Sequence, residues 1–126
     1  MSGTFTLDGE TFDVDNNVWV IGDDEECVVV DAPHDVDAIL AVVGGRKVKA
    51  IVCTHAHDDH VRVAPALREA VVAPILLHPD DKPLWDESKP YEDPQLKRAL
   101  EHLRKTIGGV GAVPGRGGFP RFGMPA

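Results

Sequence analysis

The fold of this chain is indicated by one stretch, VKAIVCTHAHDDH, at residues 48–60. Residues 48–53 are apolar apart from Lys49, which is typical of a strand buried on both faces of a sheet. Residues 54–60 hold three of the six histidines of the chain together with two aspartates. In α/β sheets the sites lie at the carboxyl ends of the strands, so the polar half of the stretch is expected to be a site.

Alternating strands and helices are predicted on both sides of this stretch. Turn and cap residues set their limits: an Asp-Gly pair at 8–9 predicts a hairpin, Asp35 can cap a helix and Gly44 can end it. The elements expected before the stretch are strands at 5–7, 11–12, 18–21 and 27–30 and a helix from 36 to 43. Those expected after it are helices at 62–71 and 95–107 and a strand at 74–77. This order predicts an α/β fold.

The composition changes near residue 85, which predicts three parts. Residues 1–85 carry the alternating pattern, and residues 86–107 form a divergent helical segment. Residues 108–126 contain seven glycines and three prolines. A tail of that kind buries too little apolar surface to offset the entropy of ordering it, so we predict that it is disordered.

Composition also narrows the function. Hydrophobic residues make up 43% and charged residues 27% of the 126 residues, which is typical of a soluble globular domain. A net charge of −8 argues against a nucleic-acid partner. No secretory signal is present at the N-terminus, and the longest apolar run, residues 70–77, is too short to span a membrane. We therefore expect a cytoplasmic protein in which Cys27 and Cys53 are buried thiols rather than a disulfide.

The polar half of the stretch has the donors of a binuclear metal centre. His55 and His57 are two residues apart at a strand end, so both can reach one ion, and Asp59 and His60 can face a neighbouring ion. Two ions about 3.5–4 Å apart can share a hydroxide that attacks a carbonyl or phosphoryl group. Asp59 is also expected to orient that water. Asp31, at the end of another strand, is expected to accept a hydrogen bond from a metal-binding histidine.

Other polar and aromatic residues are given structural roles. We expect Asp58 to face solvent. A surface or loop role is favoured over a metal site for the three histidines outside the motif, which are His34, His78 and His102. Core packing is favoured for Trp19 and Trp85.

With these residues in view, the chain resembles a known family. Residues 17–80 resemble the N-terminal half of a metallo-β-lactamase-fold hydrolase, and their pattern is similar to that of small glyoxalase II-like proteins. The motif at 54–60 matches the family's His-x-His-x-Asp-His. The resemblance implies an αββα sandwich, of which this chain would hold the ββαβα half. It also implies that His55 and His57 bind one zinc ion and that Asp59 and His60 bind a second, with iron or manganese as alternatives. The substrates it implies are small-molecule esters or thioesters, lactams or phosphodiesters.

The later ligands of the family do not follow the motif here. The His-x-Pro-Gly-His-like and Gly-Asp-x segments are absent after His60, and only His78 and His102 follow it. Three hypotheses result: a metal-dependent hydrolase with an incomplete site, a non-catalytic metal-binding or interaction remnant of the fold, and a plain α/β domain. The missing half also predicts an open sheet face, which favours self-association.

Overall fold

The computed structural model describes residues 1–106 and 121–122 of the chain. The strands are β1 (Ser2–Leu7), β2 (Glu10–Asp15), β3 (Trp19–Gly22), β4 (Glu26–Val30), β5 (Lys47–Val52), β6 (Ile75–Leu77) and β7 (Arg121–Phe122). The helices are α1 (Val36–Val43), α2 (Asp58–Val61), α3 (Ala64–Val71), α4 (Lys82–Ser88) and α5 (Pro94–Thr106), with short 3-10 turns at Pro79–Asp81 and Pro90–Glu92.

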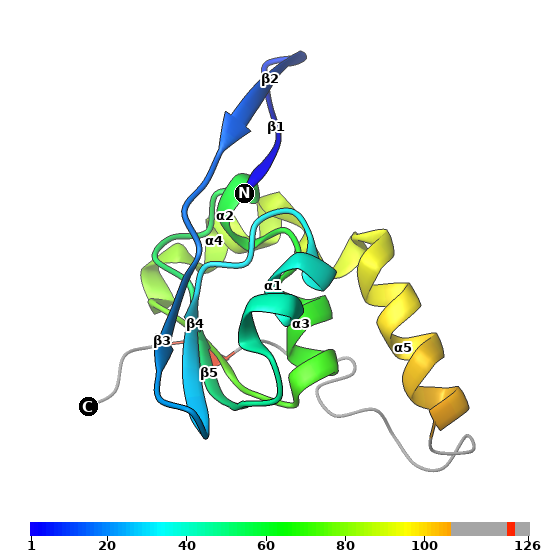
Figure 1. Ribbon diagram of the computed structural model, residues 1–126. Coiled ribbons are helices and arrows are strands. Elements are labelled where there is room, and N and C mark those ends of the chain that lie inside the picture. The colour runs from blue at the N-terminus through cyan, green and yellow to red at the C-terminus, as the bar shows by residue number, and fades with distance from the viewer. Residues whose placement is uncertain (107–120, 123–126) are drawn as a thin grey trace.

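The main sheet has five strands in the order β3-β4-β5-β6-β7. The edge strand β3 runs antiparallel to β4, and every other neighbouring pair is parallel. Helices α1 and α3 lie on one side of this sheet, and α5 packs on the outer side of α3 (Figure 1). This arrangement confirms the predicted α/β class, and it puts the end of β5 at the edge where a site is expected.

The predicted hairpin is present and longer than expected. Strands β1 and β2 form a separate two-stranded sheet that stands away from the main sheet at the N-terminal end (Figure 1). Asp8 and Gly9 both have positive φ, 51° and 80°, as the tight turn between two adjacent strands requires. The guanidinium of Arg62 donates a 2.6 Å hydrogen bond to the carbonyl of Thr4, which ties the hairpin to the segment after α2.

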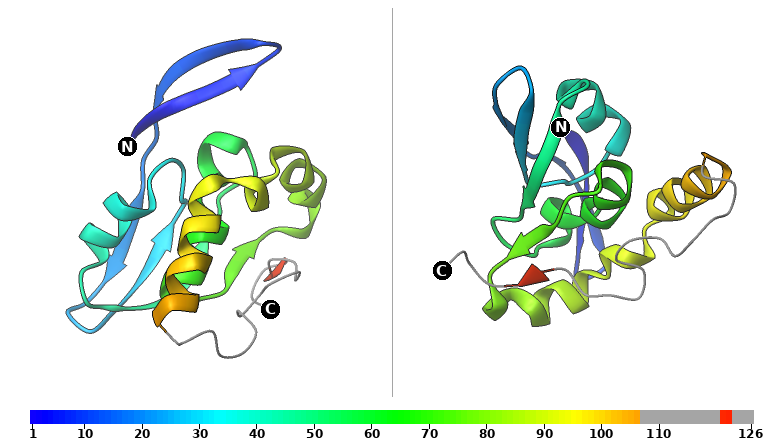
Figure 2. Two further views of the ribbon diagram at one scale, coloured as in Figure 1. Left: turned by 90° about the vertical axis from the view of Figure 1, so that its right-hand side faces the viewer. Right: turned by 90° about the horizontal axis from the view of Figure 1, so that it is seen from below.

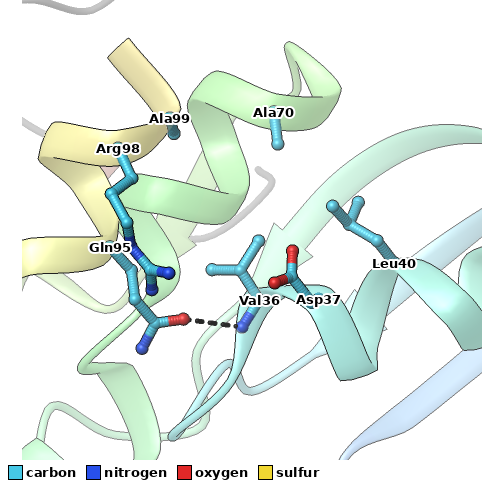
Figure 3. Close-up of a pocket in the computed structure, with 7 residues that line it drawn as sticks. All are labelled: Val36, Asp37, Leu40, Ala70, Gln95, Arg98 and Ala99. Carbon is cyan, nitrogen blue, oxygen red and sulfur yellow. Dashed lines mark hydrogen bonds between the residues drawn. The ribbon is translucent and has the colours of Figure 1, made fainter. Parts of the chain in front are cut away.

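Helix α1 begins and ends as predicted. The carboxylate of Asp35 accepts hydrogen bonds from the amides of Asp37 and Ala38, and Gly44 closes the helix at φ 65°. A contact from α5 adds to this cap, because Gln95 Oε1 accepts a 2.9 Å hydrogen bond from the amide of Val36 (Figure 3). A hollow of about 290 Å³ between α1, α3 and α5 lies beside this contact.

The two faces of the main sheet differ in burial. Ile51 is fully buried beneath the helices, whereas Ala50 and Val52, on the other face of the same strand, are only half-buried. Lys49 is exposed where the register between β4 and β5 shifts, so the prediction that this strand is buried on both faces is wrong for the face opposite the helices. On the opposite face Trp19 and Ile21 of β3 are each 60% exposed. Trp19 is therefore not a core residue, because it lies on an edge strand. The core role predicted for Trp85 is confirmed by its 2% exposure.

The segment around residue 85 is packed against the first part of the chain. Helix α4 spans that position, and the hydroxyl of Ser88 at its end donates a 2.6 Å hydrogen bond to the carbonyl of Ala56. The division at 85 and 107 stays a prediction. The predicted helix at 95–107 is confirmed as α5, with residue 107 outside the described residues.

Most of the tail at 108–126, predicted to be disordered, also lies outside the described residues. Arg121–Phe122 is the exception, because it pairs with β6 in parallel register. This pair lies beside β6, at the end of the sheet opposite β3 (Figure 2). The prediction of disorder is therefore wrong for these two residues.

The remaining expectations from composition concern membranes and cysteines. Within the described part of the chain, no helix has the length and apolar character needed to cross a membrane. Cys27 and Cys53 are free and buried, as predicted. Burial raises the pKa of the Cys53 thiol far above its ordinary value, so this thiol stays protonated.

Candidate metal centre

The motif occupies the turn between β5 and α2, at the carboxyl end of a central strand. The helix predicted at 62–71 is present as α3 (Ala64–Val71), and a short helix that was not predicted, α2 (Asp58–Val61), precedes it. The turn opens into a cavity of about 630 Å³ between the hairpin and α4. The residues that line it come from β1, the motif and α4: Phe5, Thr6, Leu7, His55, His57, Asp58, Asp59, His60, Leu84, Glu87 and Ser88.

The structure brings the four predicted metal ligands together in this cavity wall. The ring centroids of His55 and His57 are 4.8 Å apart, and those of His55 and His60 are 4.2 Å apart. Asp59 Oδ2 lies 3.8 Å from His60 Nε2. Imidazole and carboxylate groups are the kinds of ligand that zinc and iron accept.

Asp31 lies behind the motif and is 4% exposed. Its backbone has φ 65°, a left-handed conformation that Asp tolerates better than most residues. Its carboxylate accepts hydrogen bonds from the amide and hydroxyl of Thr54, at 2.8 and 2.9 Å, and from His60 Nδ1 at 3.0 Å. The contact predicted for Asp31 with a histidine of the motif is therefore present in the geometry.

These contacts fix the proton positions on two histidines. An ionised carboxylate only accepts hydrogen bonds, so His60 Nδ1 carries a proton, and Nε2 is the ring nitrogen that can serve as a metal ligand. The Thr54 hydroxyl donates to Asp31, so it accepts from His55 Nδ1 at 3.0 Å, and Nε2 is the ligand nitrogen of His55 as well. Burial, followed by the neighbouring His60 and His57, lowers the pKa of His55. A neutral ring with a free Nε2 is the form that binds metal.

The turn between the first two histidines is held through the backbone of Ala56. Ala56 is fully buried, its amide donates to Asp81 Oδ2 at 3.2 Å, and its carbonyl accepts from Ser88 Oγ at 2.6 Å. Both partners come from the start and end of α4, in or beside the segment that we expected to be divergent. Sequence analysis missed these roles because a lone Asp and a lone Ser carry no spacing signal at separations of 25 and 32 residues.

Asn16 is a second residue that sequence analysis missed. It is 7% exposed, and its Nδ2 lies 3.0 Å from Asp59 Oδ2 and 3.3 Å from His60 Nε2. It follows β2 and lies more than 40 residues before its partners in the chain. The available signal was a polar residue between a hairpin and an apolar strand, which by itself does not point to the motif.

The other polar residues have mixed outcomes. Asp58 is only partly exposed and is ion-paired with Arg62, so the prediction that it faces solvent is wrong. His78 is exposed, and its Nδ1 accepts from the amide of Asp80 at the start of a 3-10 turn, away from the cavity. His34 donates from Nε2 to Asn16 Oδ1 at 2.7 Å. The side chain of His102 lies outside the described residues.

The donors fit zinc or iron in kind but not in number. A structural zinc ion has four protein ligands and a catalytic one has at least three. Among the residues that the structure describes, no group of three His, Cys, Asp or Glu side chains is arranged to hold one ion. The motif therefore supplies two donor pairs, His55 with His57 and Asp59 with His60, and each pair needs further ligands.

A mixed α/β sheet with a His- and Asp-rich turn at the end of a buried strand defines a class of metal-binding folds. A family model described as the metallo-beta-lactamase superfamily matches residues 11–126. The chain therefore belongs to the metallo-beta-lactamase superfamily. The match includes the segment after residue 85.

Known proteins similar to the chain include several hydroxyacylglutathione hydrolases. The one from Stenotrophomonas maltophilia (strain R551-3) is 39% identical over 67 residues, which are 48% of this chain and 26% of that protein. The one from Vibrio parahaemolyticus serotype O3:K6 (strain RIMD 2210633) is 28% identical over 108 residues, which are 83% of this chain and 42% of that protein. The chain spans less than half the length of these relatives.

Two solved structures resemble the fold. A di-iron-bound form of TTHA1623 has a TM-score of 0.57 and 26% identity, covering 86% of this chain and 48% of that chain. The B3 metallo-beta-lactamase BLEG-1 has a TM-score of 0.50 and 29% identity, covering 64% of this chain and 38% of that chain. The predicted partial metallo-β-lactamase-like fold is confirmed by these likenesses.

Proposed function

We propose that this chain carries the metal-binding turn of a hydrolase that acts on a small-molecule ester or thioester. The observation that carries the proposal is the hydrogen bonding of Nδ1 on both His55 and His60, which leaves Nε2 as the ligand nitrogen of each ring beside one cavity. Asp59 lies in the same wall. The relatives named hydroxyacylglutathione hydrolase support a thioester as the substrate class.

In this proposal His55 and His57 hold one zinc ion and Asp59 and His60 hold a second, and iron or manganese suits the same donors. A metal ion bound there would lower the pKa of a bound water to about 7 and so would supply hydroxide at neutral pH. The Asp59 carboxylate would be a ligand of such an ion and would also orient that water. Asp31 and Thr54 hold the Nδ1 atoms of His60 and His55 by hydrogen bonds and so orient the two rings.

The cavity wall suits an uncharged acyl group. Phe5 and Leu7 of the hairpin and Leu84 of α4 supply its apolar part. The charged side chains of the described lining are carboxylates and histidines, with no lysine or arginine among them. An anionic acyl group would face like charges here, so we propose that the acyl side of the substrate is neutral and that Phe5, Leu7 and Leu84 exclude water from it.

A second candidate function is a metal-binding or interaction module without catalysis. It is supported by the absence of a three-donor group within the described residues. In that case the turn binds an ion weakly through one pair, and no substrate is hydrolysed. The two candidates differ in whether the missing ligands are supplied from elsewhere in the folded protein or by another chain.

Hydrolysis of a hydroxyacylglutathione thioester and of a neutral aryl ester tests the proposal. We expect turnover by the wild type, wild-type turnover by a His78→Ala control, and loss of turnover in a His55→Ala/His57→Ala variant. His78 is a matched control because it is an exposed histidine outside the cavity. Equal turnover in the wild type and the double variant would contradict the proposal, and metal binding without any turnover would favour the non-catalytic module.

Self-association through the open sheet face stays a prediction. Trp19 and Ile21 are the exposed apolar side chains of that face. Sedimentation velocity of the wild type and of a Trp19→Lys variant tests it. A dimer that the variant loses is expected, and a wild-type monomer at every concentration would contradict it.

A further inference from the structure

Asn16 is one of only three buried polar or charged residues within the described part of the chain, together with Asp31 and Glu69. It follows the last residue of β2, and its amide donates a 2.9 Å hydrogen bond to the carbonyl of Met1. The backbone is therefore held on the hairpin side while the side chain points toward the motif. A buried side-chain amide destabilises the fold unless its donors and acceptor have hydrogen-bond partners. The partners of Asn16 therefore indicate its role.

The side-chain amide of Asn16 can be oriented in only one way. Oδ1 accepts a 2.7 Å hydrogen bond from His34 Nε2, and Nδ2 donates to Asp59 Oδ2 at 3.0 Å. The reverse orientation would place the amide oxygen against a carboxylate oxygen. The second proton of Nδ2 points toward His60 Nε2 at 3.3 Å, which agrees with the lone pair that the Asp31 contact leaves on that nitrogen.

A chain of contacts supports Asn16 from behind. His34 receives a 3.5 Å contact from Arg62 Nη1 at Nδ1, and Arg62 is ion-paired with Asp58, next to Asp59 in the sequence. Burial, and then the charge of Arg62, lowers the pKa of His34, so the ring is neutral and donates from Nε2. The hairpin lies so close that a Cβ on Gly3 would be 2.3 Å from the His34 ring. The orientation of Asn16 is therefore fixed by its surroundings.

We propose that Asn16 is a positioning residue that holds Asp59 and His60 as one preformed donor pair. This inference rests on the proposed function, because it assigns a role within the same metal site. One amide group contacts both side chains of the pair and neither His55 nor His57, so its effect is confined to the second pair. The His60 contact is the longer one, and a ligand can replace it while the Asp59 contact remains.

The test compares Asn16→Ala with Asn17→Ala, its exposed neighbour, by titrating Zn²⁺ into metal-free protein against a chromophoric chelator. The wild type and Asn17→Ala are expected to bind about two equivalents. Asn16→Ala is expected to weaken one of the two by about 10- to 100-fold and to leave the other unchanged, which is the scale of lost hydrogen-bond support to a ligand. Wild-type affinity for both equivalents in Asn16→Ala would overturn the inference.

Asn16→Leu is the second variant, because it keeps about the same volume and removes the N–H donor without adding a carboxylate next to Asp59 and His60. The same selective loss is expected. Equal weakening of both equivalents, with a lower unfolding midpoint of the metal-free protein, would mean a structural role only and would overturn the inference.

The imidazole ¹⁵N resonances of metal-free protein separate this inference from the proposed function. We expect the His60 Nε2 resonance to shift in Asn16→Ala and that of His57 to stay. A wild type that binds no Zn²⁺ would overturn the proposed function, while an unshifted His60 Nε2 resonance would overturn the role of Asn16 whether or not metal binds.

Discussion

The two donor pairs of the motif are held in different ways. The side chains of Asp59 and His60 are fixed by hydrogen bonds to residues in the first third of the chain. Asp59 accepts from Asn16, and His60 donates to Asp31. His55 and His57 are positioned through the backbone of Ala56, which lies between them. Its amide donates to Asp81 and its carbonyl accepts from Ser88, at the two ends of α4. Within the described residues, His57 contacts only rings, those of Phe5 and His55.

The turn therefore depends on two distant parts of the chain, the segment that holds Asn16 and Asp31 and the segment from Asp81 to Ser88. The second pair is preformed, because its side chains already have hydrogen-bond partners in fixed orientations. In the first pair the His55 side chain has one hydrogen bond, to the Thr54 hydroxyl, and His57 has ring contacts alone among the described interactions. The first pair is therefore less fixed than the second, and it too needs further ligands to become a site. Changes at Asp31 and Asn16 should therefore act on the second pair more strongly than on the first, and changes in α4 should do the reverse.

The largest expected effect is that of Asp31→Asn. The change keeps the shape and the left-handed backbone but leaves a donor amide facing the protons of Thr54 and His60. We expect about 2 kcal/mol less stability, since buried donors lose their acceptor, and about 10- to 100-fold weaker metal binding. Urea unfolding and chelator competition measure the two quantities.

Asp35→Asn is the control for that change. Asp35 is an exposed N-cap, and Asn caps a helix as well as Asp does, so neither stability nor metal binding should change beyond about 0.5 kcal/mol. If Asp31→Asn behaves like this control, then Asp31 does not organise the turn.

The next effect is that of Ser88→Ala, which removes the hydrogen bond to the Ala56 carbonyl. Loss of one such contact lowers stability by about 1 kcal/mol. It should also loosen the first pair, so exchange of the Ala56 amide proton should quicken relative to that of the His60 amide. Native-state hydrogen exchange measures the exchange rates of the Ala56 and His60 amides, with Ser2→Ala on the exposed hairpin as the control. Unchanged protection at Ala56 would mean that α4 does not hold the turn.

The smallest effect concerns pH and His34. The folded pKa of His34 lies below its ordinary value of 6.5, first because of burial and then because of Arg62. The unfolded chain takes up this proton near pH 6.5 while the folded protein resists it, so the stability is present above pH 6.5 and is lost as pH falls below it. Between about pH 7.5 and about pH 5.5, the free energy of unfolding of metal-free protein should therefore fall more for the wild type than for His34→Gln. An equal fall in both proteins would mean that a group other than His34 causes the pH dependence.

Much of the fold could be predicted because its signals are local. The Asp8-Gly9 turn, the Asp35 cap and the apolar run of β5 each follow from neighbouring residues, and the structure has all three. The position of the motif at the end of β5 follows in the same way. The i, i+2 spacing of His55 and His57 predicts that their side chains come together, whereas the contacts that hold Ala56 between them come from distant residues.

The rest depended on distant contacts. The short helix α2 is held by the backbone of Ala32, whose amide donates a hydrogen bond to the carbonyl of His60. No sequence spacing predicts that contact. Asn16 and Ser88 reach the turn from 43 and 32 residues away. The exposure of Trp19 depends on the order of the strands, which puts β3 at the edge of the sheet.

The most direct test of the account is the metal content per folded chain, measured by elemental analysis of protein purified without chelator. The account predicts about two equivalents in the wild type, in line with a two-ion centre, and less than one in both His55→Ala/His57→Ala and Asp59→Ala/His60→Ala. The same metal content in all three proteins, or less than one equivalent in the wild type, would contradict the claim that this turn is a metal centre.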